Sequence, residues 1–316
     1  MDRLLLAQTH WTVILNPLAG RGRAERVYRH LKPALDKHLA GHTLHVSRDE
    51  HDIRRHATQA VNAGRRNFLI IGGDGSWHQL VNGVVDGLPP GRSPAAAGIT
   101  CALCPFGTGN DWVRTHGLPR RPHAWLQHFL AARPRLQNLG ILHYIDPAGP
   151  PAHRVFTNVA GLAYDAHVVR AAGRHAAGAR WRYPLLTVTQ LPRYRPAPAR
   201  LTYDGQVAEA AFHTINFGIG RYSGGGMRLV PQADPTAETF ALTYVPRLSI
   251  PRILLNGYRF YTGTIGGLGP VVTTHARTAT VTHTDPTRPV LLEADGEFLG
   301  QTPVRTELWR AALCYV

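Results

Sequence analysis

Lysine is almost absent from this chain of 316 residues, in which Lys32 and Lys37 are the only two. Arginine therefore carries nearly all of the positive charge, and the formal net charge is +15 with a sequence pI of about 10.5. A surface of this kind favours anionic membranes, nucleotides or nucleic acid as partners. A genome-wide preference for arginine is the alternative explanation. Because the chain contains none of the familiar nucleic-acid-binding modules, nucleic acid is not the expected partner.

Cysteine is scarce as well, with three residues in the chain. Cys101 and Cys104 have the spacing of metal ligands, but no second pair completes such a site. They lie in an apolar segment that predicts a buried strand, so we interpret them as structural. Eighteen histidines are scattered without a His-Glu-x-x-His arrangement, and a histidine metal site is not predicted.

Long apolar runs are also lacking, and no stretch approaches the roughly 18 residues that a membrane-spanning helix needs. The segment Met1–Ala7 is too short, and becomes polar too soon, for a signal peptide. We therefore expect a cytoplasmic protein. The length of 316 residues suggests two domains, each large enough to bury its own core.

The most informative segment is Leu69–Ser76, an apolar run that ends in Gly-Gly-Asp-Gly-Ser. Residues 68–71 predict a buried strand, and apolar positions at helical spacing over residues 77–85 predict a helix. The glycines then lie in the turn between strand and helix. There the backbone can approach a phosphate, and the N–H groups at the helix start can face an anion. A purely structural turn is the alternative for this segment taken alone.

Three other segments have a similar character. Asn16–Arg23 follows a short strand with a Pro/Gly turn and two arginines, whose forked side chains match phosphate oxygens. Pro105–Asp111 follows a predicted strand at residues 99–103. Val290–Glu297 places three carboxylates around one glycine after an apolar strand. In a cleft such a cluster suits one member to general-base work, whereas on the surface it is an acidic hairpin turn.

The predicted elements divide the chain into two domains. Residues 12–137 alternate strands and helices, with strands near 12–15, 42–46, 68–71 and 99–103, which predicts a parallel sheet covered by helices. A proline- and arginine-rich patch at residues 132–135 marks the boundary. Beyond it, short strands and frequent turns predict an antiparallel β-sandwich. Its strands are expected near 153–159, 199–204, 207–219, 238–245, 271–274, 277–283 and 288–293, and its helices over Tyr164–Ala172, Arg180–Leu191 and Ile250–Tyr261.

Six motifs in this order resemble the diacylglycerol kinase catalytic-domain superfamily, which includes bacterial diacylglycerol and phosphatidylglycerol kinases, sphingosine kinases and ceramide kinases. They are Asn-Pro-x-x-Gly at 16–20, Gly-Gly-Asp-Gly-Ser at 72–76, Gly-Thr-x-Asn-Asp-x-x-Arg at 107–114, Asn-x-x-Gly-x-x-x-Asp-Ala at 158–166, a glycine-rich loop at 216–227 and Asp-Gly-Glu at 295–297. The resemblance implies an α/β nucleotide-binding domain over residues 1–137, related to NAD kinase. It also implies a β-sandwich lipid-kinase domain over 138–304 and a return of the last segment, 305–316, to the first domain.

The resemblance further implies an ATP- and Mg²⁺-dependent kinase that phosphorylates a hydroxyl of a membrane lipid such as diacylglycerol. Such an enzyme would associate peripherally with the anionic inner face of the cytoplasmic membrane; a homodimer is left open. Asp74 is expected to orient toward magnesium. Glu297 is expected to accept the proton of the lipid hydroxyl, with Asp295 as its neighbour toward the metal or the substrate hydroxyl. On a strand the two side chains would project to the same face, whereas a sharper turn at Gly296 would swing one of them toward the cleft. The implied nucleotide contacts are Asn16, Pro17, Gly20, Arg21, Ser47, Gly72, Gly73, Asp74, Gly75, Ser76, Thr108, Gly109, Asn110 and Asp111.

Some positions depart from the pattern of this family. After Gly-Gly-Asp-Gly the family usually has Thr-x-Asn-Glu, whereas this chain has Ser76–Gln79 with the sequence Ser-Trp-His-Gln, which removes a carboxylate. Asn138 stands where many bacterial members carry Asp, and Thr236–Glu238 replaces an Asp-Asp-Gly loop linked to a structural magnesium.

These departures leave a catalytically degenerate nucleotide- or lipid-binding protein as the alternative to an active kinase. The retained Asp-Gly-Glu at 295–297 favours the kinase, because a mere binder has little need of it. The lipid itself stays open between diacylglycerol, phosphatidylglycerol, a sphingoid base and an undecaprenol-like alcohol. NAD kinase shares the Gly-Gly-Asp-Gly turn, but the segment at 158–166 favours the lipid kinases.

Overall fold

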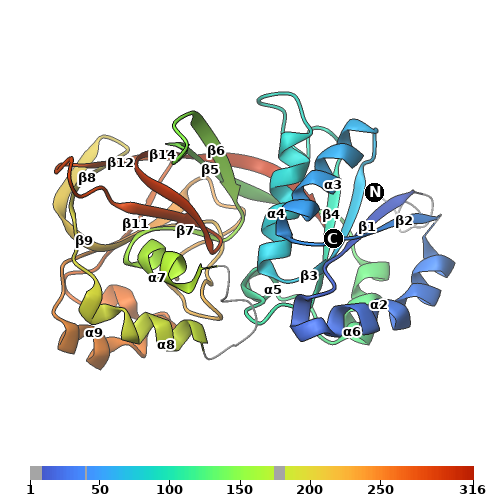
Figure 1. The fold of residues 1–316 in the computed structure, drawn as a ribbon, viewed down its shortest axis with the longest axis horizontal. Coiled ribbons are helices and arrows are strands. Elements are labelled where there is room, and N and C mark those ends of the chain that lie inside the picture. Colours follow the sequence, from blue (N-terminus) through green and yellow to red (C-terminus); the bar gives the residue numbers. More distant parts are fainter. Residues whose placement is uncertain (1–8, 40, 174–181) are drawn as a thin grey trace. The chain divides into compact units, whose positions relative to one another are not determined.

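The computed structural model describes residues 9–39, 41–173 and 182–316 (Figure 1). Their contacts divide the chain into two compact units. The first unit holds the residues up to Asn138 together with Arg310–Val316, and the second unit holds Leu139–Trp309. The chain therefore leaves the first unit once and comes back to it at its end.

The first unit is a parallel sheet in the strand order β2-β1-β3-β4. The C-terminal end of β14 (Glu297–Tyr315) lies parallel to β4, with Cys314 opposite Thr100. This unit confirms the predicted α/β domain, and parallel pairing brings the carboxyl ends of β1, β3 and β4 to one edge of the sheet. Its other elements are β1 (Trp11–Leu15), α2 (Ala19–His38), β2 (His42–Val46), α3 (Glu50–Asn62), β3 (Asn67–Gly72), α4 (Asp74–Asp86), β4 (Thr100–Pro105), α5 (Asp111–His116) and α6 (Pro122–Ala131).

Helices cover both faces of this sheet, whose central strands are apolar on both sides. On one face Val13 and Leu69 share a core with α2 and with Phe129 of α6. On the other face lie α3 and α4 (Figure 1). These two helices come so close at Gly83 that a Cβ there would lie 2.3 Å from the carbonyl oxygen of Arg54. Close packing therefore fixes α4, whose first residues belong to the glycine-rich motif.

The second unit consists of antiparallel strands. One hydrogen-bonded path runs β11-β10-β9-β7-β13-β14, and β8 and β12 connect β9 back to β14. Phe217, Leu242 and Val281, from three different strands, belong to one shared core. This confirms the predicted β-rich domain. Its elements are β5 (Arg135–Ile145), β6 (Pro151–Phe156), β7 (Val159–Ala163), α7 (Tyr164–Ala172), α8 (Arg182–Thr189), η2 (Leu191–Arg193), β8 (Pro198–Tyr203), β9 (Gln206–Gly218), β10 (Phe240–Pro246), α9 (Ile250–Asn256), α10 (Arg259–Thr262), η3 (Ile265–Gly267), β11 (Val272–Ala276), β12 (Thr278–His283) and β13 (Leu291–Ala294).

Several boundaries differ from the sequence prediction. The expected strand at 153–159 is two strands, because the chain leaves β6 after Phe156 and β7 begins at Val159. The expected helix over Ile250–Tyr261 is divided into α9 and α10 at Gly257. Of the expected helix Arg180–Leu191, residues 180 and 181 lie outside the described residues, and the rest forms α8 and η2. The strands β5 and β14 were not predicted as such.

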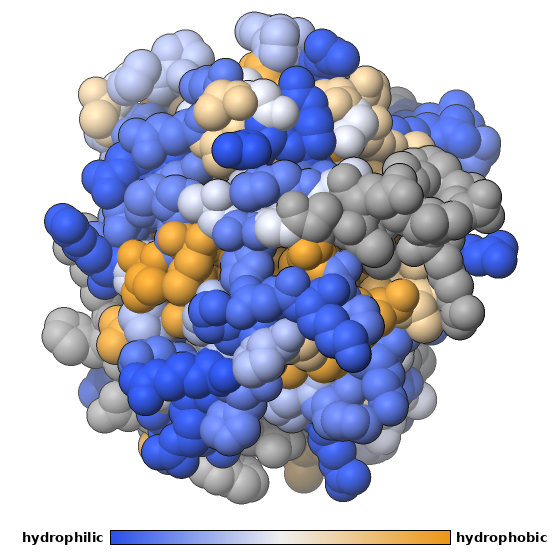
Figure 2. Space-filling model, turned by 90° about the vertical axis from the view of Figure 1, so that its right-hand side faces the viewer, coloured by the Kyte–Doolittle hydropathy of each residue, from blue (hydrophilic) through white to orange (hydrophobic). Residues whose placement is uncertain are grey.

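The surface is mostly hydrophilic on one face of the molecule. On the face that Figure 2 shows, hydrophilic side chains predominate and the hydrophobic ones form small, separate groups. Within the ranges 9–39, 41–173 and 182–316, no helix is both long and apolar enough to cross a membrane. A group of large apolar side chains that are exposed together indicates a site where a protein, a membrane or a ligand binds.

Candidate active site

The glycine turns after β3 and β4 touch each other through their backbones. A Cβ on Gly73 would lie 2.7 Å from the Cα of Gly107, and a Cβ on Gly107 would lie 2.8 Å from the Cα of Gly73. No side chain fits at such distances, so this contact requires glycine on both sides. The turn after β1 comes close as well, since a Cβ on Gly20 would lie 3.0 Å from the carbonyl oxygen of Phe106. Three of the predicted motifs therefore meet in the first unit.

Polar side chains join the same turns. Asn16, directly after β1, donates a hydrogen bond from Nδ2 to the Ser76 hydroxyl at 2.9 Å. Asp74 is the first residue of α4, and its Oδ1 accepts a hydrogen bond from the backbone N–H of Trp112 in α5 at 3.1 Å. The residue before Asp74 is Gly73, which has no side chain to cap the helix. The first N–H groups of α4 therefore remain suited to an anion such as phosphate.

The start of α2 has an unusual backbone. Gly20, Arg21 and Gly22 have φ angles of 60°, 62° and 80°, three left-handed residues in succession. Glycine adopts this conformation readily, whereas a residue with a side chain, such as Arg21, does so rarely. Such backbone strain is concentrated at functional sites. The feature therefore agrees with a ligand-binding role for the turn after β1.

The remaining predicted nucleotide contacts have less distinctive surroundings. Ser47 is buried at the end of β2, and its hydroxyl donates to the carbonyl oxygen of Leu15 at 3.3 Å. Thr108 is exposed. Asn110 is buried in the left-handed conformation, with an Oδ1 that has no hydrogen-bond partner within the described parts of the chain. Asp111 begins α5, and its Oδ1 lies 3.7 Å from Nε of Arg114. Pro17 and Gly109 add backbone only.

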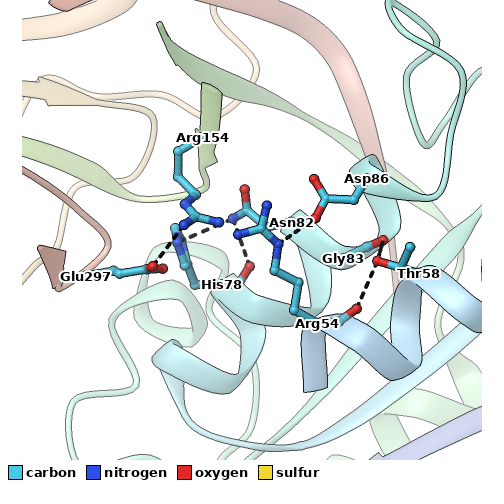
Figure 3. Close-up of polar contacts among 8 residues, drawn as sticks. All are labelled: Arg54, Thr58, His78, Asn82, Gly83, Asp86, Arg154 and Glu297. Carbon is cyan, nitrogen blue, oxygen red and sulfur yellow. Dashed lines mark hydrogen bonds and ion pairs between the residues drawn. The ribbon is translucent and has the colours of Figure 1, made fainter. Parts of the chain in front are cut away.

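The two positions of α4 that depart from the family's pattern are buried in the first unit. His78 is 1% exposed and Gln79 is 4% exposed. Nδ2 of Asn82, one turn further along, lies 3.3 Å from Nε2 of His78 (Figure 3). At the other end of the helix, Arg54 of α3 forms an ion pair with Asp86. The ion pair joins α4 to α3.

Asp295 is bound to the backbone of a neighbouring turn. Asp295 and Gly296 form the turn between β13 and β14, with φ angles of 47° and 87°. The carboxylate accepts hydrogen bonds from the N–H groups of Thr157, Asn158 and Val159 at 2.8, 2.9 and 3.0 Å, and from the Thr157 hydroxyl at 3.0 Å. Asp295 thus fastens the connection between β6 and β7. Of the two arrangements expected for Asp295 and Glu297, the structure has the turn at Gly296 and not the shared strand face.

Glu297 has a different neighbour. It is the first residue of β14, and its Oε1 lies 3.0 Å from Nη2 of Arg154 on β6 (Figure 3). The two side chains are 27% and 11% exposed. Nε and Nη1 of Arg154 are buried and have no hydrogen-bond partner in the residues that the structure describes. The guanidinium therefore positions the carboxylate and keeps donors that suit phosphate or other oxygen acceptors.

A third carboxylate and the segment at 158–166 form a tight polar cluster. Glu293 is 4% exposed and its Oε2 accepts a hydrogen bond from the N–H of Gly296 at 2.8 Å. A Cβ on Gly161 would lie 2.5 Å from Oε1 of Glu293 and 2.9 Å from the Cβ of Asp165. Asp165 in turn accepts a hydrogen bond from the Thr214 hydroxyl. Gly161 is required here because both acidic side chains press against its backbone.

A cavity of about 340 Å³ lies within the second unit. Residues of α7, α8, η2, β9, β10, α9, α10 and η3 and of the connecting loops form its walls, most of them apolar, such as Leu191, Met227 and Phe260. Asp165 and His213 are polar exceptions; burial raises the pKa of the Asp165 carboxyl and lowers the pKa of His213 to about 4. Neither ring nitrogen of His213 has a hydrogen-bond partner within the described chain. A mostly apolar cavity with a few polar groups is typical of a ligand pocket.

Comparison with known proteins agrees with this geometry. The "Diacylglycerol kinase catalytic domain" family matches residues 10–140, and the "YegS C-terminal NAD kinase beta sandwich-like domain" family matches residues 158–315. A diacylglycerol kinase of Mycobacterium tuberculosis is 30% identical over 306 residues, which cover 96% of this chain and 93% of that protein. The chain belongs to the diacylglycerol kinase family of lipid kinases.

Solved structures of this kinase family share the fold. The crystal structure of a diacylglycerol kinase from Bacillus anthracis superposes with a TM-score of 0.69 and 18% sequence identity. The match covers 97% of this chain and 96% of that one. At this level of identity, the comparison establishes the two-domain architecture of the family for this lipid kinase.

Metal ligands are few in this family member. Within the described residues no group of three or more histidines, cysteines, aspartates or glutamates could hold an ion. Oδ1 of Asn138 instead accepts a hydrogen bond from the N–H of Ala311 at 2.8 Å, and Thr236 donates two hydrogen bonds to Asp234. The side chains that replace the family's acidic residues thus hydrogen-bond within the protein. Cys101 and Cys104 are buried free thiols of β4, where burial raises the pKa of each.

Two residues of the candidate site in this lipid kinase, Arg154 and His213, were not predicted from the sequence. Arg154 has no local signal, because Glu297 lies 143 residues further along the chain. His213 belongs to a strand whose sequence resembles any half-buried strand, and only the fold shows that it lines the cavity.

Proposed function

We propose that this lipid kinase transfers the γ-phosphoryl group of ATP to a hydroxyl of a membrane lipid such as diacylglycerol. The observation that supports ATP as donor is the contact between Gly73 and Gly107, which brings two glycine turns and the start of α4 together. Backbone N–H groups at a helix start and in glycine turns bind phosphate groups. Family membership supports the lipid acceptor.

Asp74 is the residue that would hold Mg²⁺ together with the phosphates. Mg²⁺ in kinase sites is bound by one or two carboxylates plus substrate phosphate oxygens and water, so a single carboxylate at the phosphate site fits its needs. The bound ion neutralises charge on the phosphates. Asp74 lies at the start of α4 and keeps its orientation through the hydrogen bond from Trp112.

Glu297 is the proposed general base. Its carboxylate would take the proton of the lipid hydroxyl while that oxygen bonds to the γ-phosphorus and the bond to the β-phosphate oxygen breaks, releasing ADP. Arg154 would orient the carboxylate through the 3.0 Å contact. Glu297 suits this task better than Asp295, whose oxygens already accept four hydrogen bonds. Asp295 would support the turn that carries Glu297.

The cavity of the second unit is the proposed site for a hydrocarbon chain of the lipid. Its wall is mostly apolar, and transferring an alkyl chain into it removes apolar surface from water. Because the lipid resides in a bilayer, we further propose that the enzyme acts as a peripheral protein at an anionic membrane surface. The net charge of +15 supports this location.

An assay with radiolabelled ATP and mixed micelles tests the function. Diacylglycerol, phosphatidylglycerol, a sphingoid base and an undecaprenol-like alcohol are offered separately, and label is measured in the extracted lipid. We expect Asp74→Asn to lower turnover at least a hundredfold without unfolding the protein, since Asn keeps the acceptor for Trp112. Asp86→Asn, at the far end of α4, is the matched control. Nucleotide binding without any labelled lipid would instead identify a non-catalytic binder.

A further inference from the structure

Exposed apolar side chains are concentrated on three short helices of the second unit. Twelve large hydrophobic residues are exposed among those that the structure describes, and seven of them lie on or next to α8, α9 and α10. Leu255 is 76% exposed and Leu185 is 62% exposed. We call these seven residues the apolar rim: Leu185, Val188, Ile250, Leu254, Leu255, Tyr258 and Tyr261.

The apolar rim borders the cavity. Four of its members, Val188, Leu254, Tyr258 and Tyr261, also line the cavity wall. The same helices therefore present apolar side chains to the cavity on one side and to the surroundings on the other. An exposed apolar group that is continuous with a ligand cavity indicates contact with a hydrophobic phase or partner.

The helices that carry the rim are cationic. The sequences of α8, α9 and α10 contain three arginines and neither aspartate nor glutamate. Arg252 lies on α9 and Arg259 begins α10. Two copies of this chain that met through the rim would bring arginine against arginine. Charge complementarity therefore favours an anionic occupant over a second copy.

We propose that the apolar rim is a membrane-docking surface that inserts into the interface of a bilayer containing anionic phospholipids. Leucines enter the boundary between head groups and acyl chains, tyrosines suit that boundary because one end of the ring is polar, and arginines bind the phosphate groups. The helices α8, α9 and α10 are too short to span a bilayer, so they lie along its surface. The docking follows from the second unit alone; only the entry of a lipid into the cavity rests on the proposed function.

Vesicle sedimentation of the full chain tests the proposal. Vesicles of phosphatidylcholine alone are compared with vesicles containing about 30% phosphatidylglycerol. The double variant Leu185→Asp/Leu255→Asp should reduce partitioning to the anionic vesicles by about a hundredfold, because two apolar anchors are lost and two negative charges are added. Val207→Asp is the matched control: it is 60% exposed on β9, outside the rim, and should change partitioning less than twofold.

A second pair of variants tests how much arginine contributes to the binding of anionic vesicles. Arg252→Ser should weaken binding to anionic vesicles severalfold and leave the weak binding to phosphatidylcholine unchanged. Arg92→Ser, an exposed arginine of the first unit, is the control. Raised salt should weaken the wild-type binding in the same direction. Circular dichroism and thermal unfolding verify that each variant is folded.

Two outcomes would overturn the docking surface. Partitioning that is unchanged in the folded double variant would show that the rim does not enter the membrane. Sedimentation equilibrium that finds a dimer in the wild type and a monomer in the double variant, with vesicle binding intact, would identify a second copy as the occupant. Turnover on water-dispersed dioctanoylglycerol keeps the proposals separate. Absence of turnover in the wild type would count against the proposed function and not against docking, whereas the double variant should keep wild-type turnover because neither Leu185 nor Leu255 lines the cavity.

Discussion

Separate replacement of Asp295, in the turn between β13 and β14, and of Glu297, at the start of β14, should separate an effect on stability from an effect on turnover. The Asp295 carboxylate accepts four hydrogen bonds of 2.8–3.0 Å, three of them from backbone N–H groups. In Asp295→Asn an NH₂ group replaces one acceptor oxygen, so at least one backbone donor loses its partner. A hydrogen bond to a charged group contributes about 1.5–3 kcal/mol, and a buried unpaired donor costs about 1–3 kcal/mol. We expect a loss of roughly 2–5 kcal/mol.

Thermal unfolding and lipid turnover are the two measurements. For a domain of this size the expected loss corresponds to a decrease in Tm of roughly 5–15 °C. Glu297→Gln keeps an oxygen for the hydrogen bond from Arg154, so its Tm should change by less than about 2 °C, while turnover decreases by about a hundredfold or more. Asp285→Asn is the control, because Asp285 accepts its two hydrogen bonds from Thr287 in an exposed turn.

One result would refute this reasoning directly. If Asp295→Asn keeps the wild-type Tm and loses turnover, then Asp295 takes part in the chemistry and the roles of the two carboxylates are reversed. If both variants keep wild-type turnover, neither carboxylate is the base.

Three further predictions follow from contacts in the two units. Gly73→Ala should weaken ATP binding at least tenfold in calorimetry, because its Cβ would lie 2.7 Å from the facing glycine, whereas Gly269→Ala, with open space around it, should leave affinity unchanged. Arg154→Gln should lower turnover at least tenfold with unchanged ATP affinity, and equal losses in both would contradict a role in positioning Glu297. Burial lowers the pKa of His116 and of His213 to about 4 in the folded protein. Between pH 6.5 and 4 the unfolded chain therefore binds more protons than the folded protein. Both rings then reduce the free energy of unfolding as the pH falls through this interval. His213→Phe should therefore make Tm less dependent on pH there; an unaltered pH profile would contradict a buried neutral ring.

The α/β unit was the most predictable part of the molecule. Three of its strands, β1, β3 and β4, are mostly apolar runs that end in turn residues, and the four predicted strands correspond to β1, β2, β3 and β4 within one or two residues. In the β-rich unit the prediction failed for β14, where Pro303 suggests an interruption. The strand continues through it: Thr302 and Val304 are buried on either side, and Val304 pairs with Val281.

The candidate site was predictable only where it is local in sequence. The glycine turns can be recognised in the sequence because their close backbone contact requires glycine, and the structure brings Gly73 and Gly107 into contact. The difference between Asp295 and Glu297 could not be predicted, since it depends on Thr157 and Arg154, which are distant in sequence. The cavity could not be predicted either, because eight separate helices and strands and the loops between them form its wall, and none carries a distinctive pattern.

The strand β14 has a consequence for how the chain folds during synthesis. Its first half pairs with β13 and β12, and its last residues complete the first unit, where Cys314 lies opposite Thr100 and the N–H of Ala95 bonds to Ala312. The sheet edge at β4 therefore stays open until the ribosome has made residues 314 and 315. An N-terminal fragment ending near Asn138 carries an unpaired, apolar edge strand, which is a known starting point for aggregation. We therefore expect solubility during translation to depend on residues 310–316, which complete a sheet whose other strands are made much earlier.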